Sequence, residues 1–234
     1  MNADDREKTC LPLFCDMPML RDLQPEAQRF IAGGCHLRTA SKGRVVCEKG
    51  SQLDGFFFIV RGRIKLAVLS ADGSERVIDI LLPGSSFGES AALLQQPCPT
   101  HAEALCDTRL LFVDRERLRQ ALARWPEVAF AVLGSVARRV YDLTRNLEEC
   151  CLHSARQRVA SFLLRDASHD ETDSVPSAVE LPAAKVVVAS SLNLTAETFS
   201  RELHDLAREG IVDIDRRTIR ILSVDRLRYR CCAG

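Results

Sequence analysis

The chain has 234 residues, and its 32 lysines and arginines balance 32 aspartates and glutamates, so the formal net charge is zero. A hydrophobic fraction of 46% is enough to bury a core, which excludes an intrinsically disordered chain. Neutrality also excludes a generally polycationic nucleic-acid binder, but it is compatible with a local basic face.

The first residues are charged rather than apolar, with an acidic and basic run at 4–8. This run is not a signal peptide, and no apolar stretch of the sequence is long enough to span a membrane. We therefore expect a cytoplasmic protein without a membrane partner. In that compartment the 10 cysteines indicate reduced thiols rather than a disulfide framework.

The first half of the sequence predicts antiparallel β structure. Residues 10–32 are expected to form short helical or irregular segments, and most of the 12 glycines follow between Gly33 and Gly88. The glycines separate short apolar or alternating runs, which lie at 44–48, 56–60, 64–69, 77–82 and 105–113. Short strands joined by glycine-containing turns are typical of a sandwich or jelly roll. We predict a jelly-roll domain with an N-terminal helical segment over residues 1–124.

A long helix is predicted over residues 125–152, because Pro126 suits its first turn. Apolar residues then recur at alternating spacings of four and three, namely Ala129, Leu133, Val136, Val140, Leu143, Leu147 and Cys150. This pattern indicates a coiled-coil seam, which is narrower than the face a helix buries in its own domain. We expect a homodimer, with packing of the helix on its own domain as the alternative. Because seam residues face their mates in a parallel pair, oxidation could link two protomers at Cys150.

Residues 153–234 have the order of a winged helix-turn-helix domain. The expected elements are a helix at 154–166, a polar loop at 167–178, helices at 183–190 and 195–210, and strands at 211–215 and 218–222. Thr195 is a good N-cap and Gly210 a good C-cap for the second helix of the motif. A helix, a short turn, a second helix and a two-stranded wing define this motif.

The start of the second helix carries side chains that suit base recognition. In a helix-turn-helix this turn enters the major groove, and here it contains Thr195, Glu197, Thr198, Ser200 and Arg201. Arginine contacts guanine in a bidentate manner, and glutamate accepts from the amino group of cytosine. A solvated ion pair between positions four apart is the alternative for Glu197 and Arg201. We predict that these residues bind DNA, with Arg217 of the wing contacting phosphate.

These residues resemble the recognition helix of the cyclic-AMP receptor protein / fumarate–nitrate reduction regulator (Crp/Fnr) superfamily. Similarity to the sensor roll of that family extends upstream through Gly62-Arg63-Ile64-Lys65, Asp72-Gly73 and Pro83-Gly84-Ser85-Ser86-Phe87-Gly88-Glu89. The resemblance implies a cytoplasmic, dimeric transcription regulator, mostly an activator, that binds a palindrome and contacts RNA polymerase. Ser200 beside Arg201, with Ala196 before them, is similar to the fumarate–nitrate branch. That similarity implies a site of the type TTGAT-n4-ATCAA.

For the effector pocket, the resemblance points to Gly88, Glu89, Ser90, Pro99 and Thr100. Family members that bind cyclic nucleotides place an Arg-Ser pair on the phosphate, where this chain has Pro99-Thr100. Proline offers neither charge nor an N–H group, and a buried phosphodiester needs a cation and donors. We therefore do not expect cyclic AMP to bind.

Two other cofactors follow from branches of the same superfamily. Iron–sulfur ligation requires closely spaced cysteines, whereas Cys10, Cys15, Cys35 and Cys106 are widely spaced, so a cluster is not expected. The overall pattern is most similar to the nitric-oxide-responsive denitrification regulators, which sense with haem. The candidates for an axial haem ligand are His36, His101, His153 and Cys98.

The sequence thus predicts an α+β protein with an N-terminal antiparallel jelly roll, a dimerisation helix and a C-terminal winged helix-turn-helix. An enzyme is not expected, because a nucleophile elbow, a P-loop and a metal-spaced His/Glu pair are all missing. We predict a nitric-oxide-responsive activator that uses haem. The alternatives are an oxygen or redox sensor that uses cysteine thiols or an iron–sulfur cluster, and a cyclic-nucleotide-binding module without a role in transcription.

Overall fold

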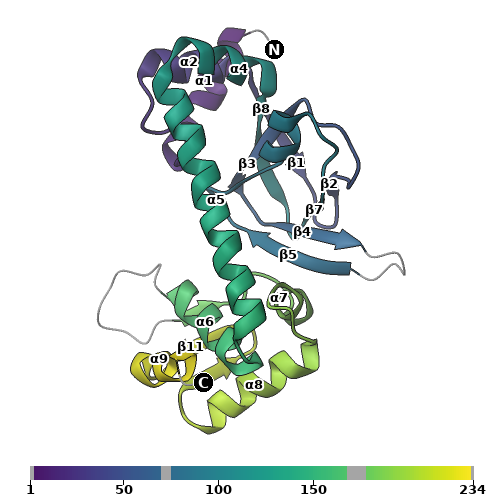
Figure 1. Ribbon diagram of the computed structural model, residues 1–234, viewed down its shortest axis with the longest axis vertical. Coiled ribbons are helices and arrows are strands. Elements are labelled where there is room, and N and C mark those ends of the chain that lie inside the picture. The colour runs from purple at the N-terminus through teal and green to yellow at the C-terminus, as the bar shows by residue number, and fades with distance from the viewer. Residues whose placement is uncertain (1–2, 70–74, 168–177, 233–234) are drawn as a thin grey trace. The chain divides into compact units, whose positions relative to one another are not determined.

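The computed structural model describes residues 3–69, 75–167 and 178–232, and it divides the chain into two compact units, Met1–Tyr141 and Asp142–Gly234 (Figure 1). The boundary lies inside the longest helix, α5 (Pro126–Leu152). The predicted turn at Asp72-Gly73 and most of the predicted polar loop, residues 168–177, lie outside the described residues.

The first unit contains two antiparallel sheets of four strands each, with the strand orders β1-β8-β3-β6 and β2-β7-β4-β5. Their bounds are β1 (Cys35–Ala40), β2 (Val45–Cys47), β3 (Gly55–Arg61), β4 (Ile64–Leu69), β5 (Glu75–Leu81), β6 (Ser86–Phe87), β7 (His101–Ala104) and β8 (Thr108–Asp114). This architecture confirms the predicted antiparallel β domain.

The strand prediction missed β1, β6 and β7. The expected strand at 105–113 begins three residues later, as β8, and a turn joins it to β7, which belongs to the other sheet. In that turn, the carboxylate of Asp107 accepts a hydrogen bond of 3.1 Å from the backbone N–H of Lys42. Strand β1 was missed because its sequence is largely polar and it is placed by its antiparallel register with β8.

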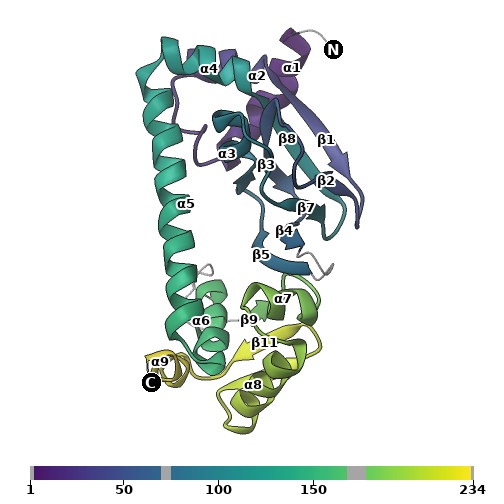
Figure 2. The same ribbon diagram turned by 45° about the vertical axis from the view of Figure 1, so that its right-hand side comes forward.

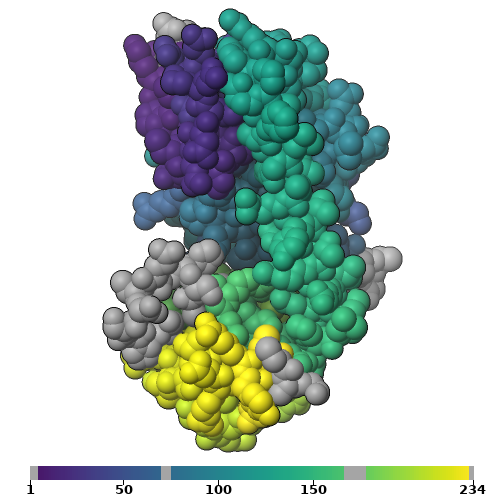
Figure 3. All heavy atoms as spheres, turned by 60° about the vertical axis from the view of Figure 1, so that its left-hand side comes forward, coloured from purple at the N-terminus to yellow at the C-terminus, as the bar shows by residue number. Residues whose placement is uncertain are grey.

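Helices close one end of the roll in the first unit (Figures 1 and 3). They are α1 (Ala3–Cys10), the 3-10 segment η1 (Leu11–Asp16), α2 (Pro25–Ala32) and α4 (Arg115–Arg124), while α3 (Glu89–Leu94) is inserted between β6 and β7. Of these helices, α1, α3 and α4 were not predicted. Figure 3 shows the N-terminal segment against the first turns of α5, where Phe14, Ile31 and Val128 share one buried core.

A second core fills the inside of the roll. The rings of Phe57 and Phe87 are stacked with centroids 5.1 Å apart, and Phe112 meets Phe57 edge-on at the same distance. Offset-stacked and edge-on arrangements are the favoured geometries for aromatic pairs. Packed aromatic rings therefore occupy the interior of the roll.

The second unit has the predicted order of elements together with two elements that were not predicted. Its elements are α6 (Ala155–Ala167), β9 (Ala178–Glu180), α7 (Lys185–Ser191), α8 (Ala196–Arg208), β10 (Val212–Asp215), β11 (Thr218–Ile221) and α9 (Val224–Cys232). Strand β9 adds a third strand to the wing, in the order β10-β11-β9, and α9 packs against α6 (Figure 2). Cys231 is consequently part of the fold, with its sulfur 2.9 Å from the hydroxyl of Ser161.

Within the described ranges, no helix has both the length and the apolar character that a membrane crossing requires.

Candidate functional site

The recognition helix α8 begins with a side-chain cap. The hydroxyl of Thr195 accepts a hydrogen bond of 3.1 Å from the backbone N–H of Thr198, and it donates one of 2.9 Å to the Thr198 hydroxyl. This cap satisfies one of the N–H groups that a helix start leaves without a partner. Both threonines, predicted as DNA-binding residues, therefore also organise the first turn.

The two faces of α8 differ sharply in burial. Phe199, Leu203 and Leu206 are completely buried in the second unit. Glu197 and Arg201 are exposed on the opposite side, and Ser200 is half-buried between the two faces. The structure thus presents Glu197 and Arg201 on the side of the helix away from the core, with Ser200 half-buried.

The expected alternative for Arg201 was an ion pair with Glu197. The guanidinium of Arg201 instead lies 3.7 Å from the carboxylate of Glu202, and its side chain remains 60% exposed. An ion pair of this exposure contributes little to stability. Arg201 can therefore exchange this neighbour for a ligand at low cost.

The turn between α7 and α8 is held by an arginine that the sequence did not indicate. The guanidinium of Arg158, in α6, donates to the carbonyl oxygens of Leu192 and Asn193, at 2.9 and 3.1 Å. Asn193 has a φ of 54°, a left-handed conformation that asparagine tolerates better than most residues. Arg158 thus fixes the entry into the recognition helix.

The tip of the wing contains two arginines with different surroundings. Arg216 is exposed and has a φ of 54°. The guanidinium of Arg217 donates a 2.9 Å hydrogen bond to the carbonyl oxygen of Leu181, whose N–H donates back to the Arg217 carbonyl. Arg217, predicted as a phosphate contact, is therefore also a structural residue. It joins the tip of the wing to Leu181, which directly follows β9.

The C-terminal end of α8 is anchored by a cluster of charges. The carboxylate of Glu209 interacts with Arg156, and at 2.9 Å with Arg230, while Arg226 donates to its carbonyl oxygen. The hydrogen bond from Arg156 lowers the pKa of Glu209. This cluster connects α6, α8 and α9 and supports the recognition helix from behind.

In the roll, Glu89 begins α3 and Gly88 is its N-cap. Gly88 adopts a φ of 88°, which favours glycine at this turn. Burial raises the pKa of the half-buried Glu89, against a hydrogen bond from Ser86 that lowers it. The nearby Arg139 pairs with Asp79 at 2.6 Å. The carboxyl group of Glu89 therefore lies near Arg139, but Arg139 forms its ion pair with Asp79.

The remaining predicted pocket residues offer little to an anion. Pro99 and Ser90 are exposed, and Thr100 is half-buried and precedes β7. The carbonyl of Thr100 accepts a hydrogen bond from the Cys98 thiol, at 3.3 Å. A bound phosphodiester would need a fixed cation at this position, and the chain provides proline and threonine.

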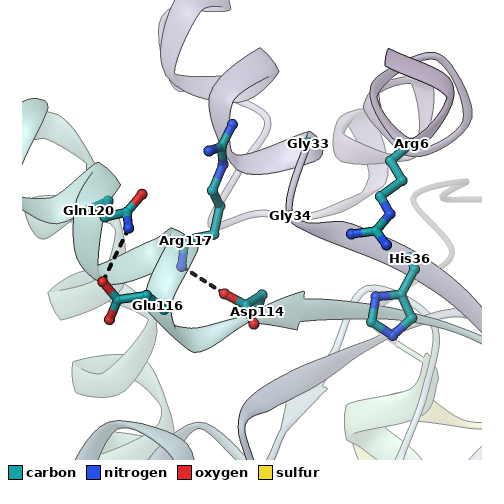
Figure 4. Close-up of a pocket in the computed structure, with 8 residues that line it drawn as sticks. All are labelled: Arg6, Gly33, Gly34, His36, Asp114, Glu116, Arg117 and Gln120. Carbon is teal, nitrogen blue, oxygen red and sulfur yellow. Dashed lines mark hydrogen bonds between the residues drawn. The ribbon is translucent and has the colours of Figure 1, made fainter. Parts of the chain in front are cut away.

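A cavity of about 300 Å³ lies at the helical end of the first unit, away from these residues (Figure 4). Its lining residues are Arg6, Gly33, Gly34, His36, Asp114, Glu116, Arg117 and Gln120. Two hydrogen bonds hold Arg117. Its side-chain Nε donates to the Phe30 carbonyl at 2.7 Å, and its backbone N–H donates to the Asp114 carboxylate at 2.8 Å. Because charges of both signs line the cavity, and Arg117 and Glu116 are hydrogen-bonded within the fold, the cavity specifies no ligand.

The four haem candidates are not brought together. His36 lies in this charged cavity, where burial and Arg38 lower its pKa, and His153 follows the end of α5 in the other unit. Cys98 is buried with its thiol bonded to Thr100, and His101 begins β7 beside the ring-filled interior. The cavity that contains His36 is not lined by His101, His153 or Cys98. These residues do not form an apolar slot that fits a haem.

The four cysteines considered for an iron–sulfur cluster are not gathered at one place. Cys10 and Cys35 are buried in one core, Cys15 is exposed, and Cys106 lies in the turn before β8. In the part of the chain that the structure describes, no three histidine, cysteine or acidic side chains are grouped to hold a metal ion.

The predicted seam of α5 is exposed in the single chain. The side chains of Leu133, Val136, Val140, Leu143 and Leu147 are between 41% and 63% exposed, and Cys150 is half-buried. A helix packed on its own domain would bury such a stripe. The exposure therefore disfavours the alternative in which this stripe packs on its own domain.

Comparison with protein-family models identifies two domains. Residues 37–124 match the cyclic nucleotide-binding domain, and residues 157–230 match the Crp-like helix-turn-helix domain. The two matches coincide with the roll and with the unit that contains α8.

Individual proteins show the same pairing of domains. The chain is 27% identical to the cyclic AMP receptor protein of Thermus thermophilus over 214 residues, which cover 87% of this chain and 92% of that protein. It is 26% identical to a CRP-like cAMP-activated global transcriptional regulator of Mycobacterium tuberculosis over 190 residues, 81% of this chain and 85% of the relative. The structure of FixK2 from Bradyrhizobium japonicum superimposes with a TM-score of 0.77 and 24% identity, covering 86% of this chain and 98% of that one.

Proposed function

Because the chain belongs to the Crp/Fnr family of transcription regulators, we propose that it binds a palindromic DNA site as a homodimer, with α8 of each protomer in the major groove. The observation that carries this proposal is the division of α8 into a fully buried apolar face and an exposed face with Glu197 and Arg201. Only the exposed face is free to contact bases. The capped first turn holds that face in a fixed geometry.

The proposed half-site is of the TTGAT type, in a TTGAT-n4-ATCAA-like palindrome. Arg201 would donate to the O6 and N7 atoms of guanine, and Glu197 would accept from a cytosine amino group. Ser200, at the edge of the same face, would contact a neighbouring base. Selection of bound sequences from a random DNA pool tests this assignment, and enrichment of TGTGA half-sites would contradict it.

Dimerisation is proposed to occur through the exposed stripe of α5. Two copies of a 27-residue helix can pair along Leu133, Val136, Val140, Leu143 and Leu147 and bury side chains that are exposed in one chain. A dimer of this kind places two recognition helices on half-sites about one DNA turn apart. We propose that an effector changes the pairing of these helices and so the spacing of the half-site contacts.

The family also suggests the setting of this activity. We propose a cytoplasmic activator that contacts RNA polymerase once it is bound upstream of a promoter. In vitro transcription from a promoter carrying the selected palindrome tests this part, and a lower transcript yield on addition of the protein would indicate a repressor.

Cyclic AMP, named in two of the relatives above, is not the proposed effector. At the place of the phosphate-binding pair the chain has an exposed proline and Thr100, and the interior of the roll holds the rings of Phe57 and Phe87. Titration of the protein with cyclic AMP should give no saturable heat at micromolar concentrations. Saturable binding would contradict this part of the proposal.

Nitric oxide remains the proposed effector, on the resemblance to the denitrification regulators. A haem would supply the nitric-oxide chemistry, but the described residues offer it no apolar slot, so no residue is given the role of ligand here. Addition of haem to the purified protein, with and without nitric oxide, tests the proposal. A Soret band that shifts with nitric oxide supports it, and the absence of a stoichiometric band contradicts it.

A further inference from the structure

Two cysteines that are far apart in the sequence meet in the core of the roll. Cys47 ends β2 and Cys98 lies in the segment between α3 and β7, and the two side chains are only 4% and 5% exposed. Both are free thiols and belong to the same buried cluster. Ser51 contacts both residues: its hydroxyl lies 3.4 Å from the Cys47 sulfur, and its carbonyl oxygen accepts a hydrogen bond of 2.8 Å from the backbone N–H of Cys98.

The backbone holds the two segments in this register. The N–H of Cys98 donates to the carbonyl of Ser51, and the N–H of Gly50 donates to the carbonyl of Cys98, both at 2.8 Å. Strand β2 continues this pairing against β7, with Cys47 opposite Ala102. Backbone hydrogen bonds therefore hold the segment that carries Cys98 against the end of β2, where Cys47 lies.

The two thiols differ in acidity because of their surroundings. The hydrogen bond from Cys47, helped by the interactions with Thr100 and His101, lowers the pKa of Cys98 to about 6. Its partner keeps the proton, because the same bond and burial raise the pKa of Cys47. The thiolate is the reactive form of cysteine, so Cys98 is the nucleophile of the pair once it loses the proton that its thiol donates to the Thr100 carbonyl.

A second pair of cysteines in this unit shows that burial alone does not create this reactivity. Cys10 and Cys35 are also buried and interact with each other, but burial raises the pKa of both. The Cys35 thiol donates to the Ile31 carbonyl at 3.3 Å rather than to a sulfur. Both thiols of this pair therefore remain protonated and unreactive.

We propose that Cys47 and Cys98 form an oxidisable dithiol that a hydroperoxide converts into an intramolecular disulfide. The Cys98 thiolate attacks one oxygen of hydrogen peroxide, the O–O bond breaks, and hydroxide leaves and is protonated to water, which leaves a sulfenic acid on Cys98. The Cys47 sulfur then attacks the Cys98 sulfur, the S–O bond breaks, and a second water leaves with the Cys47 proton. Both sulfurs are oxidised by one electron each, and the peroxide is reduced by two.

The location of the pair gives the disulfide a structural consequence. Cys98 directly precedes Pro99-Thr100, so the bond would fix the segment that follows α3 to β2 at the end of the roll where Gly88 and Glu89 lie. Cys47 and Cys98 are buried, whereas their chain neighbours Glu48, Pro97 and Pro99 are exposed. The disulfide is independent of DNA binding, and a role as input to DNA binding rests on the proposed function.

Peptide mapping of the whole protein tests the dithiol. The reduced protein is treated with stoichiometric hydrogen peroxide, alkylated and digested with trypsin and a glutamate-specific protease, which separates Cys98 from Cys106 by cleavage after Glu103. We expect a linked pair of peptides containing Cys47 and Cys98, two hydrogens lighter than the free peptides and restored by dithiothreitol. The proposal would be overturned if Cys98 were still free to be alkylated after the exposed Cys15 and Cys151 had been oxidised.

Three variants sharpen the test. Cys47→Ser should leave Cys98 as a sulfenic acid that dimedone labels at least about tenfold faster than any other cysteine, because the thiolate is the nucleophile. Cys98→Ser should abolish both the disulfide and the sulfenic acid. Cys106→Ser is the matched control: Cys106 lies in the same tryptic peptide as Cys98, and this variant should still form the disulfide. If the serine variants do not fold, the map of the unsubstituted protein decides alone.

Two further readouts separate this proposal from the others. A protein linked at Cys150 would migrate as a dimer on a non-reducing gel. The Cys47–Cys98 disulfide lies within one chain, so the protein would migrate as a monomer, and this result would not contradict dimerisation through α5. Binding of the reduced protein to the TTGAT palindrome is measured in parallel. If the reduced protein does not bind the palindrome but the mapped disulfide forms on oxidation, the proposed function is contradicted and the dithiol is supported.

Discussion

The hydroxyl of Thr195 accepts a hydrogen bond from the backbone N–H of Thr198, 3.1 Å away, and this contact begins the helix that carries the predicted base-contacting residues. The cap and the base contacts occupy the same turn. The stability of the second unit and the affinity for DNA are therefore linked at Thr195.

Thr195→Ala should destabilise the protein by about 1 kcal/mol, because an N–H at the start of α8 loses its acceptor. Urea unfolding monitored by circular dichroism measures the change. Thr195→Ser keeps the hydroxyl and should retain most of the stability. Equal losses in the two variants would show that the methyl group, and not the cap, matters.

Arg201→Ala should weaken binding to the palindrome by about 1–3 kcal/mol per half-site and relax the preference at one base position, because the bidentate hydrogen bonds to guanine are removed. Fluorescence anisotropy with the parent site and its single-base variants measures both effects. Arg208→Ala is the matched control, since Arg208 lies at the other end of α8 and pairs with Asp205 at 3.0 Å. A uniform decrease in affinity over all DNA sequences for Arg201→Ala would assign this residue to phosphate instead.

Leu143→Asp should abolish specific DNA binding without any change in the recognition helix, because a charge in the seam prevents pairing of α5. Analytical ultracentrifugation should show a monomer, and circular dichroism should show intact helices. Tyr141→Asp serves as the control: Tyr141 is 69% exposed but lies off the seam spacing, so that variant should remain dimeric. A dimeric Leu143→Asp protein would place the interface elsewhere.

The two wing arginines should behave differently. Arg216→Ala should lower the slope of log K against log salt by about one for each phosphate that the variant no longer neutralises, with no decrease in stability. Arg217→Ala should lower the slope in the same way and also destabilise the fold by about 1 kcal/mol, because its hydrogen bond to the Leu181 carbonyl is removed. An unchanged unfolding midpoint for Arg217→Ala would argue against this structural role.

Acid should weaken the second unit through Glu209. Its pKa is lowered in the folded state by the hydrogen bond from Arg156, so the pair contributes stability above the pKa of the unfolded chain. That contribution is lost as the pH falls through the folded-state pKa. Glu209→Gln should flatten the pH dependence of the unfolding midpoint below pH 5, roughly where unfolded glutamates titrate. An identical acid profile in the variant would exclude this pair as its source.

The sequence by itself predicted what depends on local spacing. The alternation of apolar residues by three and four predicted α5, and Thr195 and Gly210 predicted the ends of α8 to within two residues. Alternation and glycine positions predicted an antiparallel roll. These signals could be found because a helix or a turn is specified by neighbours within a few residues.

Only the tertiary structure decided the contacts between segments that are distant in the sequence. The register of β2 with β7 places Cys47 against Cys98, and the pairing of β9 with β11 brings Leu181 to Arg217. Likewise, the packing of Phe57, Phe87 and Phe112 fills the interior of the roll. Strand partners and ring packing depend on the whole roll closing at once, so no short stretch of sequence specifies them.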